Sequence, residues 1–338
     1  PDGDIETPLG VKFKSPEQKK GMLPELLINL MKDRDSAKEL QASAKTKSDE
    51  DYYRRIQEAI KILMNSVYGV FASYFYRFTN LNIGASITAY AREYVKDILV
   101  ELENEGVDVI YGDTDSVFFR SPYDDLNKTI EFGESIADRY SVGAKQLEFE
   151  KILQPFFSHG VKKRYVGKQI WPKESMLIRG YETRRTDAFP IQVQALEDIF
   201  AKLMDKNIED ALESSKNWVT KISEGEFDDD KFVISKTVNL KRKYVNEDNQ
   251  AHLQAYKKYI ETGRPFVSGM KISFIVTDAS ISPMKVEPYI PEETCPKPDY
   301  NYYADRIAKS LSRITDVFDW DEKALKKGKR APKQQTLF

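Results

Sequence analysis

Two apolar runs separated by four polar residues predict a sharp reversal of the chain. Val107–Tyr111 and Ser116–Phe119 are rich in β-branched and aromatic residues, and Gly112-Asp113-Thr114-Asp115 lies between them. Such runs around a short segment with Gly and Asp predict a β-hairpin. Its flanks are apolar on both faces, so we expect the hairpin to be largely buried, with two carboxylates at its tip.

The two carboxylates have two interpretations. If the tip is buried, Asp113 and Asp115 repel each other unless a cation neutralises them. Two Mg²⁺ ions about 3.5–4 Å apart would do so, and would stabilise the attacking and leaving oxygens of a phosphoryl transfer. Alternatively, Asp and Thr only favour the turn and both acids face water. Taken alone, this motif fits the turn interpretation better.

Two helices are predicted before the hairpin. Apolar residues at helical spacing begin at Leu23, with Pro24 in the first turn, and predict a helix that ends near Ala44. Ser48 and the acids after it predict the N-cap and first turn of a second helix. The link between them is short and polar, so we predict a helical hairpin. The apolar stripe of the second helix is Tyr53, Ile56, Ile60, Leu63, Met64 and Val67.

The opposite face of the second helix carries residues at intervals of three and four: Arg54, Glu58, Lys61, Asn65 and Tyr68. Lys61, Asn65 and Tyr68 present a cation, an amide and an aromatic ring along one line. A cation binds a triphosphate, and a ring followed by a glycine can pack under a base pair. The same spacing also describes an ordinary solvated helix face.

Strands and helices alternate through the middle of the chain, and helices dominate after about Met176. A helix from Gly84 to Gly106 is predicted, ended by the glycine, with Ala89, Tyr90, Tyr94, Ile98 and Leu102 on its buried side. This order of elements predicts an α+β fold. The other predicted elements are helices Asp124–Arg139, Ile191–Asn207, Ile208–Ser223 and Tyr302–Phe318, and strands Leu147–Glu150 and Lys163–Val166.

Composition narrows the function classes. The 338 residues carry a formal net charge of -2, one Cys and two His. This excludes an internal disulfide framework, argues against a structural zinc site, and fits a reducing, cytoplasmic location. Any metal should be a hard cation held by carboxylates. No apolar run is long enough to predict a membrane span. Basic residues cluster locally, which is typical of a phosphate track: Lys162–Arg164, Arg184–Arg185, Lys241–Lys243 and the tail from Lys326 to Lys333.

Three motifs resemble those of one family and follow its order. Lys61-Ile-Leu-Met-Asn65-Ser66-Val-Tyr68-Gly69 resembles the fingers motif K-x3-N-S-x-Y-G of family B DNA polymerases of the archaeal type. Tyr111-Gly-Asp113-Thr114-Asp115-Ser116 resembles the palm motif Y-x-D-T-D-S, and Lys162-Lys163-Arg164-Tyr165 resembles K-K-R/K-Y. Three ordered matches are far rarer by chance than one. Weaker resemblances are Leu147–Glu150 to the acidic palm strand, and Arg179–Glu182 with Arg185 and Asp187 to the start of the thumb.

The resemblance implies a right-hand polymerase fragment. Its α+β fold would comprise helical-hairpin fingers, an α+β palm and a mostly helical thumb. The implied divisions are a lead-in at 1–22, fingers at 23–66, palm at 67–175, thumb at 176–325 and a basic flexible tail at 326–338.

The resemblance also implies roles for individual residues. Asp115 would bridge two Mg²⁺ ions, with Asp113 as a weaker or indirect ligand and Glu150 supporting the metal region. Tyr68 would pack at the nascent base pair, and the phosphates of the incoming dNTP would contact Lys61, Asn65 and Arg34. Primer–template DNA would be held through its backbone, without sequence readout, by Lys162, Lys163, Arg164 and Tyr165, with further contacts from Arg185, Lys241, Arg242 and Lys243.

A second palm motif of the family, D-x-x-S-L-Y-P-S, is not found in this sequence. Neither are the family's exonuclease motifs and N-terminal domain. We therefore expect the chain to be inactive without a polypeptide that carries these parts, either in a split polymerase or after processing. One alternative is a catalytically inactive, polymerase-like DNA-binding subunit, which would have no need for the intact set of Lys61, Asn65, Tyr68, Asp113 and Asp115. The other is a metal-dependent nuclease, which leaves the Lys61 helix unexplained.

The C-terminal residues resemble the beginning of a sliding-clamp-binding box, Q-x-x-L. Gln334, Leu337 and Phe338 would be the contact residues, although the complete box ends in two further aromatics and at most Phe338 is present. The alternative, a frayed chain end that carries two apolar residues and binds nothing, has nearly equal weight. A terminal Leu-Phe on a polar tail lowers solubility unless something binds it, which favours clamp docking. The expected partners are thus DNA, dNTP, the complementing polypeptide and a clamp, in a nucleoid-associated protein with no membrane contact.

Overall fold

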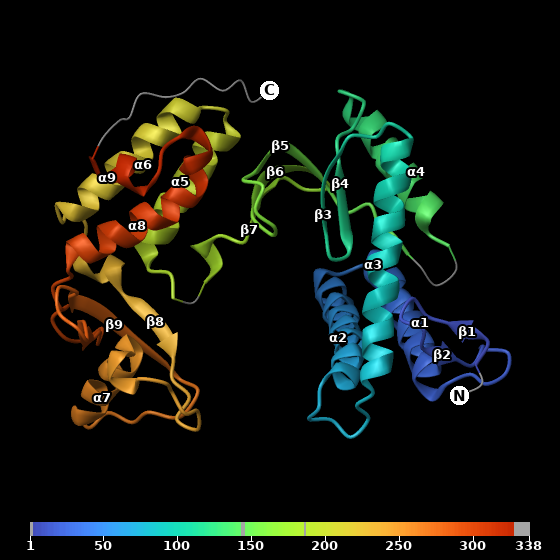
Figure 1. The fold of residues 1–338 in the computed structure, drawn as a ribbon, viewed down its shortest axis with the longest axis horizontal. Coiled ribbons are helices and arrows are strands. Elements are labelled where there is room, and N and C mark those ends of the chain that lie inside the picture. The colour runs from blue at the N-terminus through green and yellow to red at the C-terminus, as the bar shows by residue number, and fades with distance from the viewer. Residues whose placement is uncertain (1–2, 143–145, 186, 328–338) are drawn as a thin grey trace. The chain divides into compact units, whose positions relative to one another are not determined.

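A computed structural model describes residues 3–142, 146–185 and 187–327 (Figure 1). The chain divides into two compact units, Pro1–Phe149 and Glu150–Phe338. The predicted α+β class is confirmed. The boundary between the units falls inside the segment predicted as palm, and the predicted functional divisions stay predictions. Within the described ranges, no helix is long and apolar enough to cross a membrane.

The first unit consists of helices, a small sheet near its start and one hairpin. Its helices are α1 (Met22–Ala42), α2 (Lys47–Ala72), α3 (Leu81–Asn104) and α4 (Leu126–Tyr140). Its strands are β1 (Ile5–Glu6), β2 (Lys12–Phe13), β3 (Val109–Asp113) and β4 (Ser116–Phe119).

Helices α1 and α2 form the predicted helical hairpin and pack along each other. The cap of α2 is Thr46, two residues before the predicted Ser48, and its hydroxyl accepts a hydrogen bond from the Asp49 amide at 3.1 Å. Helix α3 ends as predicted, because Gly106 has a φ of +81° that suits a glycine beyond a helix end. Two residues expected in apolar stripes are exposed instead, namely Leu63 on α2 and Tyr90 on α3.

The hairpin of β3 and β4 is covered on one side only. Val109, Val117 and Phe119 pack against a small core from α3 and α4, made of Ile98, Leu102, Ile136 and Tyr140. Ile110 is 45% exposed, and no residue of either strand is fully buried. The expectation of a largely buried hairpin is therefore wrong, because its two helices cover a single face.

The second unit contains two three-stranded antiparallel sheets and a helical layer. The first sheet has the order β5 (Ile152–Ser158), β6 (Tyr165–Trp171), β7 (Ser175–Arg179), and the second has the order β10 (Lys285–Pro288), β9 (Lys271–Asp278), β8 (Ile234–Thr237). The helices are α5 (Pro190–Met204), α6 (Ile208–Ser223), α7 (Ala251–Glu261), α8 (Tyr300–Thr315) and α9 (Glu322–Lys327). Short 3-10 turns are η1 (Glu182–Arg184), η2 (Asp229–Phe232), η3 (Glu247–Asn249) and η4 (Asp316–Phe318).

The core of this unit centres on α5 and α8. Tyr303, Ile307, Leu311 and Ile314 recur every three or four residues along α8, and all are inaccessible to solvent. The helices predicted here are present within a few residues. Leu147–Glu150 is not a strand, β6 begins at Tyr165 rather than Lys163, and β5, β7, α7 and the second sheet were not predicted.

Candidate functional site

The tip of the β3–β4 hairpin is a two-residue turn. Asp113 pairs with Ser116 across the ladder, which leaves Thr114 and Asp115 as the turn residues. Thr114 has a φ of +56°, an unusual conformation for a β-branched residue. Its hydroxyl donates to Oδ1 of Asp113 at 3.0 Å, and the Asp113 carbonyl accepts from the Asp115 amide at 2.6 Å. The turn thus holds the Asp113 carboxylate next to its neighbour's hydroxyl.

The two carboxylates of this tip are not enclosed. Asp115 is exposed and Asp113 is half-buried. Burial therefore does not force a cation onto the pair. The expected buried tip, which was the reason to place a metal ion there, is wrong. What supports a cation site is the chemistry of the donors, two hard carboxylates on one tight turn.

These donors fit Mg²⁺ that is shared with a substrate. Among the described residues, no group of three or more His, Cys, Asp or Glu gathers in a way that could hold a metal ion. Glu150, the predicted third ligand, lies in the second unit, where it is exposed and 3.0 Å from the Lys151 ammonium. Mg²⁺ is commonly bound by one or two carboxylates, with substrate phosphates and waters completing its shell. Asp113 and Asp115 could supply the carboxylates for one such ion.

The polar face of α2 is accessible along the line predicted from sequence. Lys61 and Asn65 are exposed, and Tyr68 is 41% exposed. Space is also open at Gly69, where an added Cβ would meet nothing within 4 Å. Arg54 differs from this row because its guanidinium lies 3.1 Å from Asp51 and 3.2 Å from Glu58. The accessible row therefore consists of Lys61, Asn65 and Tyr68.

Arg34, the predicted phosphate contact on α1, is half-buried. Its Nε is buried without a hydrogen-bond partner in the described part of the chain. A buried donor of this kind is costly unless something accepts its hydrogen bond.

The basic motif Lys162–Tyr165 lies at the turn between β5 and β6. Lys162 and Lys163 are exposed, Arg164 is half-buried, and Tyr165 is the first residue of β6. Lys163 has a φ of +66°. Its carbonyl lies so close to Gly180 that a Cβ there would be 2.0 Å from the oxygen. Sequence reasoning noted Gly180 only as part of a motif and missed this close approach.

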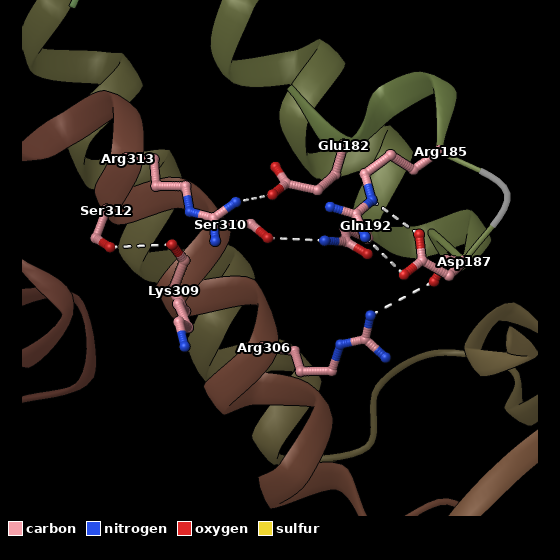
Figure 2. A network of polar contacts seen from close by, with 9 residues as sticks. All are labelled: Glu182, Arg185, Asp187, Gln192, Arg306, Lys309, Ser310, Ser312 and Arg313. Atoms are coloured by element: carbon pink, nitrogen blue, oxygen red, sulfur yellow. Dashed lines mark hydrogen bonds and ion pairs between the residues drawn. The ribbon is translucent and has the colours of Figure 1, made fainter. Parts of the chain in front are cut away.

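The segment after β7 is tied to α8 by several polar contacts (Figure 2). Glu182 forms an ion pair with Arg313, and Nε2 of Gln192 donates to the Ser310 hydroxyl at 2.7 Å. The Asp187 carbonyl accepts from Arg306 at 3.4 Å. These contacts reach positions 306, 310 and 313, which lie on one face of α8. Sequence reasoning missed Arg306, Ser310 and Arg313, because nothing local marks them.

The guanidinium of Arg185, a predicted DNA contact, forms an ion pair with the Asp187 carboxylate. Two hydrogen bonds of 2.9 Å join the pair, and they lower the pKa of the Asp187 carboxyl and raise the pKa of Arg185. The Arg185 side chain remains 60% exposed, so it can still meet a phosphate while Asp187 fixes its orientation.

The remaining predicted site residues lie elsewhere. Lys241, Arg242 and Lys243 are exposed on the loop after β8, and Arg242 lies 5.5 Å from the centre of the Tyr244 ring. Gln334, Leu337 and Phe338 lie outside the described residues.

The accessible row on α2, the aspartates of the hairpin tip and the basic turn follow each other in the order expected of a nucleic acid polymerase. A family model described as DNA polymerase family B matches residues 5–318. The chain belongs to DNA polymerase family B, which confirms the resemblance seen in its motifs.

Curated relatives agree with this assignment. A DNA polymerase of Paramecium bursaria Chlorella virus NY2A is 33% identical over 296 residues, covering 80% of this chain and 32% of the viral protein. The DNA polymerase delta catalytic subunit of Caenorhabditis elegans is 27% identical over 351 residues, covering 96% of this chain and 32% of the relative. That of Schizosaccharomyces pombe is 28% identical over 335 residues, with 91% and 30% covered. The chain thus spans about a third of the length of these relatives.

A solved structure has the same fold. The family B DNA polymerase of the hyperthermophilic archaeon Pyrobaculum calidifontis matches with a TM-score of 0.62 and 21% identity, over 94% of this chain and 41% of that one.

Proposed function

We propose that this chain carries part of the DNA-synthesising centre of a family B polymerase, and that it acts in nucleotidyl transfer from dNTP to the 3′-hydroxyl of a primer. The observation that carries the proposal is the pair of carboxylates, Asp113 and Asp115, on a two-residue turn in a chain of this family. The relatives' names, DNA polymerase and DNA polymerase delta catalytic subunit, support it.

In this reaction the primer oxygen forms a bond to the α-phosphorus while the bond to the leaving pyrophosphate breaks. Asp113 and Asp115 would hold Mg²⁺, expected as two ions, together with the substrate's phosphates. When bound, Mg²⁺ lowers the pKa of the hydroxyl and neutralises the triphosphate. Lys61 and Asn65, helped by Arg34, contact the phosphates of the dNTP. Tyr68 packs at the nascent base pair and so tests its shape.

The duplex is held by groups on the second unit. Lys162, Lys163, Arg164 and Tyr165 contact the backbone of the newly formed duplex, and Arg185 and the loop 241–243 add further phosphate contacts. Such contacts position DNA without reading its sequence, as a template copier requires.

We further propose that a polypeptide segment outside residues 1–338 completes the first unit. Two carboxylates are few for two ions, and Ile110 on the hairpin that carries them is 45% exposed. The loop between α2 and α3 also exposes aromatic rings, with Phe75 97% and Tyr74 80% accessible. Rings of this size are ordinarily covered. The segment supplies a further palm aspartate and continues into the exonuclease and N-terminal domain, on the same or a separate polypeptide.

Two smaller proposals accompany this one. The C-terminal Gln334, Leu337 and Phe338 dock on a sliding clamp. The protein works in the cytoplasm, associated with the nucleoid.

Primer extension tests the proposal. The chain of residues 1–338 is assayed with Mg²⁺, dNTP and primer–template DNA, alone and mixed with a polypeptide that carries the S-L-Y-P-type palm motif. Extension is expected only in the mixture. Extension by the chain alone refutes its dependence on the segment, and degradation of DNA without dNTP supports a nuclease instead.

Asp115→Asn tests the role of the hairpin carboxylate. The variant should abolish extension in the mixture and leave duplex binding unchanged, since it removes a metal ligand and no phosphate contact. Asp124→Asn, which changes another exposed aspartate of the same unit, should keep full activity. Loss of duplex binding along with extension would mean that Asp115 is structural. Duplex binding without extension by the unmodified mixture would favour the catalytically inactive subunit.

A further inference from the structure

The basic turn between β5 and β6 is fastened at its start to the far end of α8. His159 follows the last residue of β5, and its Nε2 lies 2.5 Å from Oδ1 of Asp316, the first residue of η4. Next to it, the rings of Phe157 and Phe318 stack with centroids 6.1 Å apart. A polar and an apolar contact thus join the same two segments, which are about 160 residues apart in the chain.

The environment of His159 determines how this contact is made. Its side chain is 17% exposed, and Nδ1 is buried without a hydrogen-bond partner in the described part of the chain. An ionised carboxylate can only accept a hydrogen bond. In the contact with Asp316 the proton therefore lies on Nε2, which donates to the carboxylate.

The turn itself is tightly built from His159 onward. Gly160 and Lys163 both have positive φ, +82° and +66°, and the Arg164 amide donates to the Val161 carbonyl at 3.2 Å. At the other end, the Lys163 carbonyl rests against Gly180. Three consecutive cations, Lys162 to Arg164, are thereby presented on a short segment held at both ends.

We propose that His159 and Asp316 are positioning residues for duplex binding. Their hydrogen bond fixes the start of the turn, so that the three cations are ordered before DNA arrives and little ordering remains for the binding step. Neither side chain contacts DNA itself. The inference rests on the proposed function, in which this turn holds the newly formed duplex.

The test measures binding of the full chain to a fluorescein-labelled primer–template duplex by fluorescence anisotropy over a range of salt concentrations. His159→Ala should weaken binding about 5- to 30-fold, the factor for about 1–2 kcal/mol. The slope of log K against log salt should not change, because no phosphate contact is removed. His159→Gln, which keeps an N–H donor toward Asp316, should bind like the unmodified chain.

Asp316→Ala gives a second route in case His159→Ala does not fold. It removes a negative charge, which by itself would favour DNA binding, yet the loss of the tie should weaken binding to the same extent. Asp319→Asn, an exposed aspartate three residues further on, controls for the change in charge and should bind slightly more tightly or equally well. The double variant His159→Ala/Asp316→Ala should be no weaker than either single variant.

Lys163→Ala/Arg164→Ala separates this inference from the proposed function. The pair should weaken binding and lower the salt slope by about 2, since each phosphate contact contributes about 0.9. If this pair behaves as expected while His159→Ala and Asp316→Ala bind normally, the positioning role is refuted and the duplex site stands. If the pair itself has no effect, the duplex site is wrong and the positioning role is refuted with it.

Discussion

Adding one methyl group at Gly180 should displace the neighbouring turn and destabilise the second unit. The φ of Gly180 is +74°, and an added Cβ would lie 2.0 Å from the Lys163 carbonyl oxygen and 2.9 Å from Cγ of Arg164. Carbon atoms do not approach a backbone oxygen so closely, so Gly180→Ala must displace the turn 160–163 by about 1 Å.

The cost of this substitution has two parts. The left-handed backbone costs a non-glycine residue about 1–2 kcal/mol, and forcing apart well-packed groups costs about 1–3 kcal/mol. Their sum is about 2–5 kcal/mol. Gly160→Ala is a matched control in the same turn, because its φ is +82° but an added Cβ meets nothing within 4 Å. Only the backbone part, about 1–2 kcal/mol, applies there.

Thermal unfolding followed by calorimetry compares the two variants. For a unit of this size, 1 kcal/mol shifts Tm by about 2–4 °C. Gly180→Ala should therefore unfold about 2–12 °C below Gly160→Ala. Equal Tm values for the two variants would refute the close approach of the Lys163 carbonyl.

Two further predictions concern the second unit. His252 is 3% exposed, and its burial near Lys236 and Arg242 lowers its pKa to about 4; since an unfolded histidine titrates near 6.5, this group stabilises the fold fully above pH 6.5 and progressively less as the pH falls toward about 4. An NMR titration should place its midpoint near 4, and a midpoint near 6.5 would contradict the buried, neutral state. Ile307→Ala, in the inaccessible stripe of α8, should lower the free energy of unfolding in urea by about 2–5 kcal/mol. Ile281→Ala, at a side chain 51% exposed, should change it by at most about 0.5 kcal/mol, and similar losses at both positions would contradict the placement of α8.

Apart from α7 and α9, the helices could be predicted from the sequence because their signals are local. The stripes of α2 and α3 recur at 3.6-residue spacing, and Gly106 marks the end of α3. Strands depend on partners that periodicity does not reveal. β5 contains Pro155, which argues against a strand, and its register with β6 shifts between Leu153 and Phe156.

At Leu147–Glu150, by contrast, a strand was predicted where the structure has none. Its alternation of apolar and acidic residues predicted a strand, but the Ser141 hydroxyl engages both the amide and the carbonyl of Leu147, at 2.9 and 3.1 Å. The Phe149 ring packs on α4, where an added Cβ at Gly133 would lie 2.3 Å from it. Competing local hydrogen bonds and packing outweigh the alternation.

For the candidate site, sequence predicted the identity of the groups better than their surroundings. The row on α2 was predicted from its spacing, and the hairpin from the two apolar runs around Gly112–Asp115. In the structure the turn lies one residue later, between Asp113 and Ser116. The exposure of Asp115 could not be predicted, because it depends on which elements cover the hairpin. The link from Glu182 to Arg313 also joins residues too far apart in the chain for any local pattern to indicate.

The conformation of Thr114 limits how the hairpin can be improved by engineering. A glycine at this position would relieve the positive φ and should make the turn more stable. It would also delete the hydroxyl that holds the Asp113 carboxylate. Turn stability and carboxylate orientation therefore make opposite demands on a single residue, and a variant selected only for thermostability would tend to lose the second.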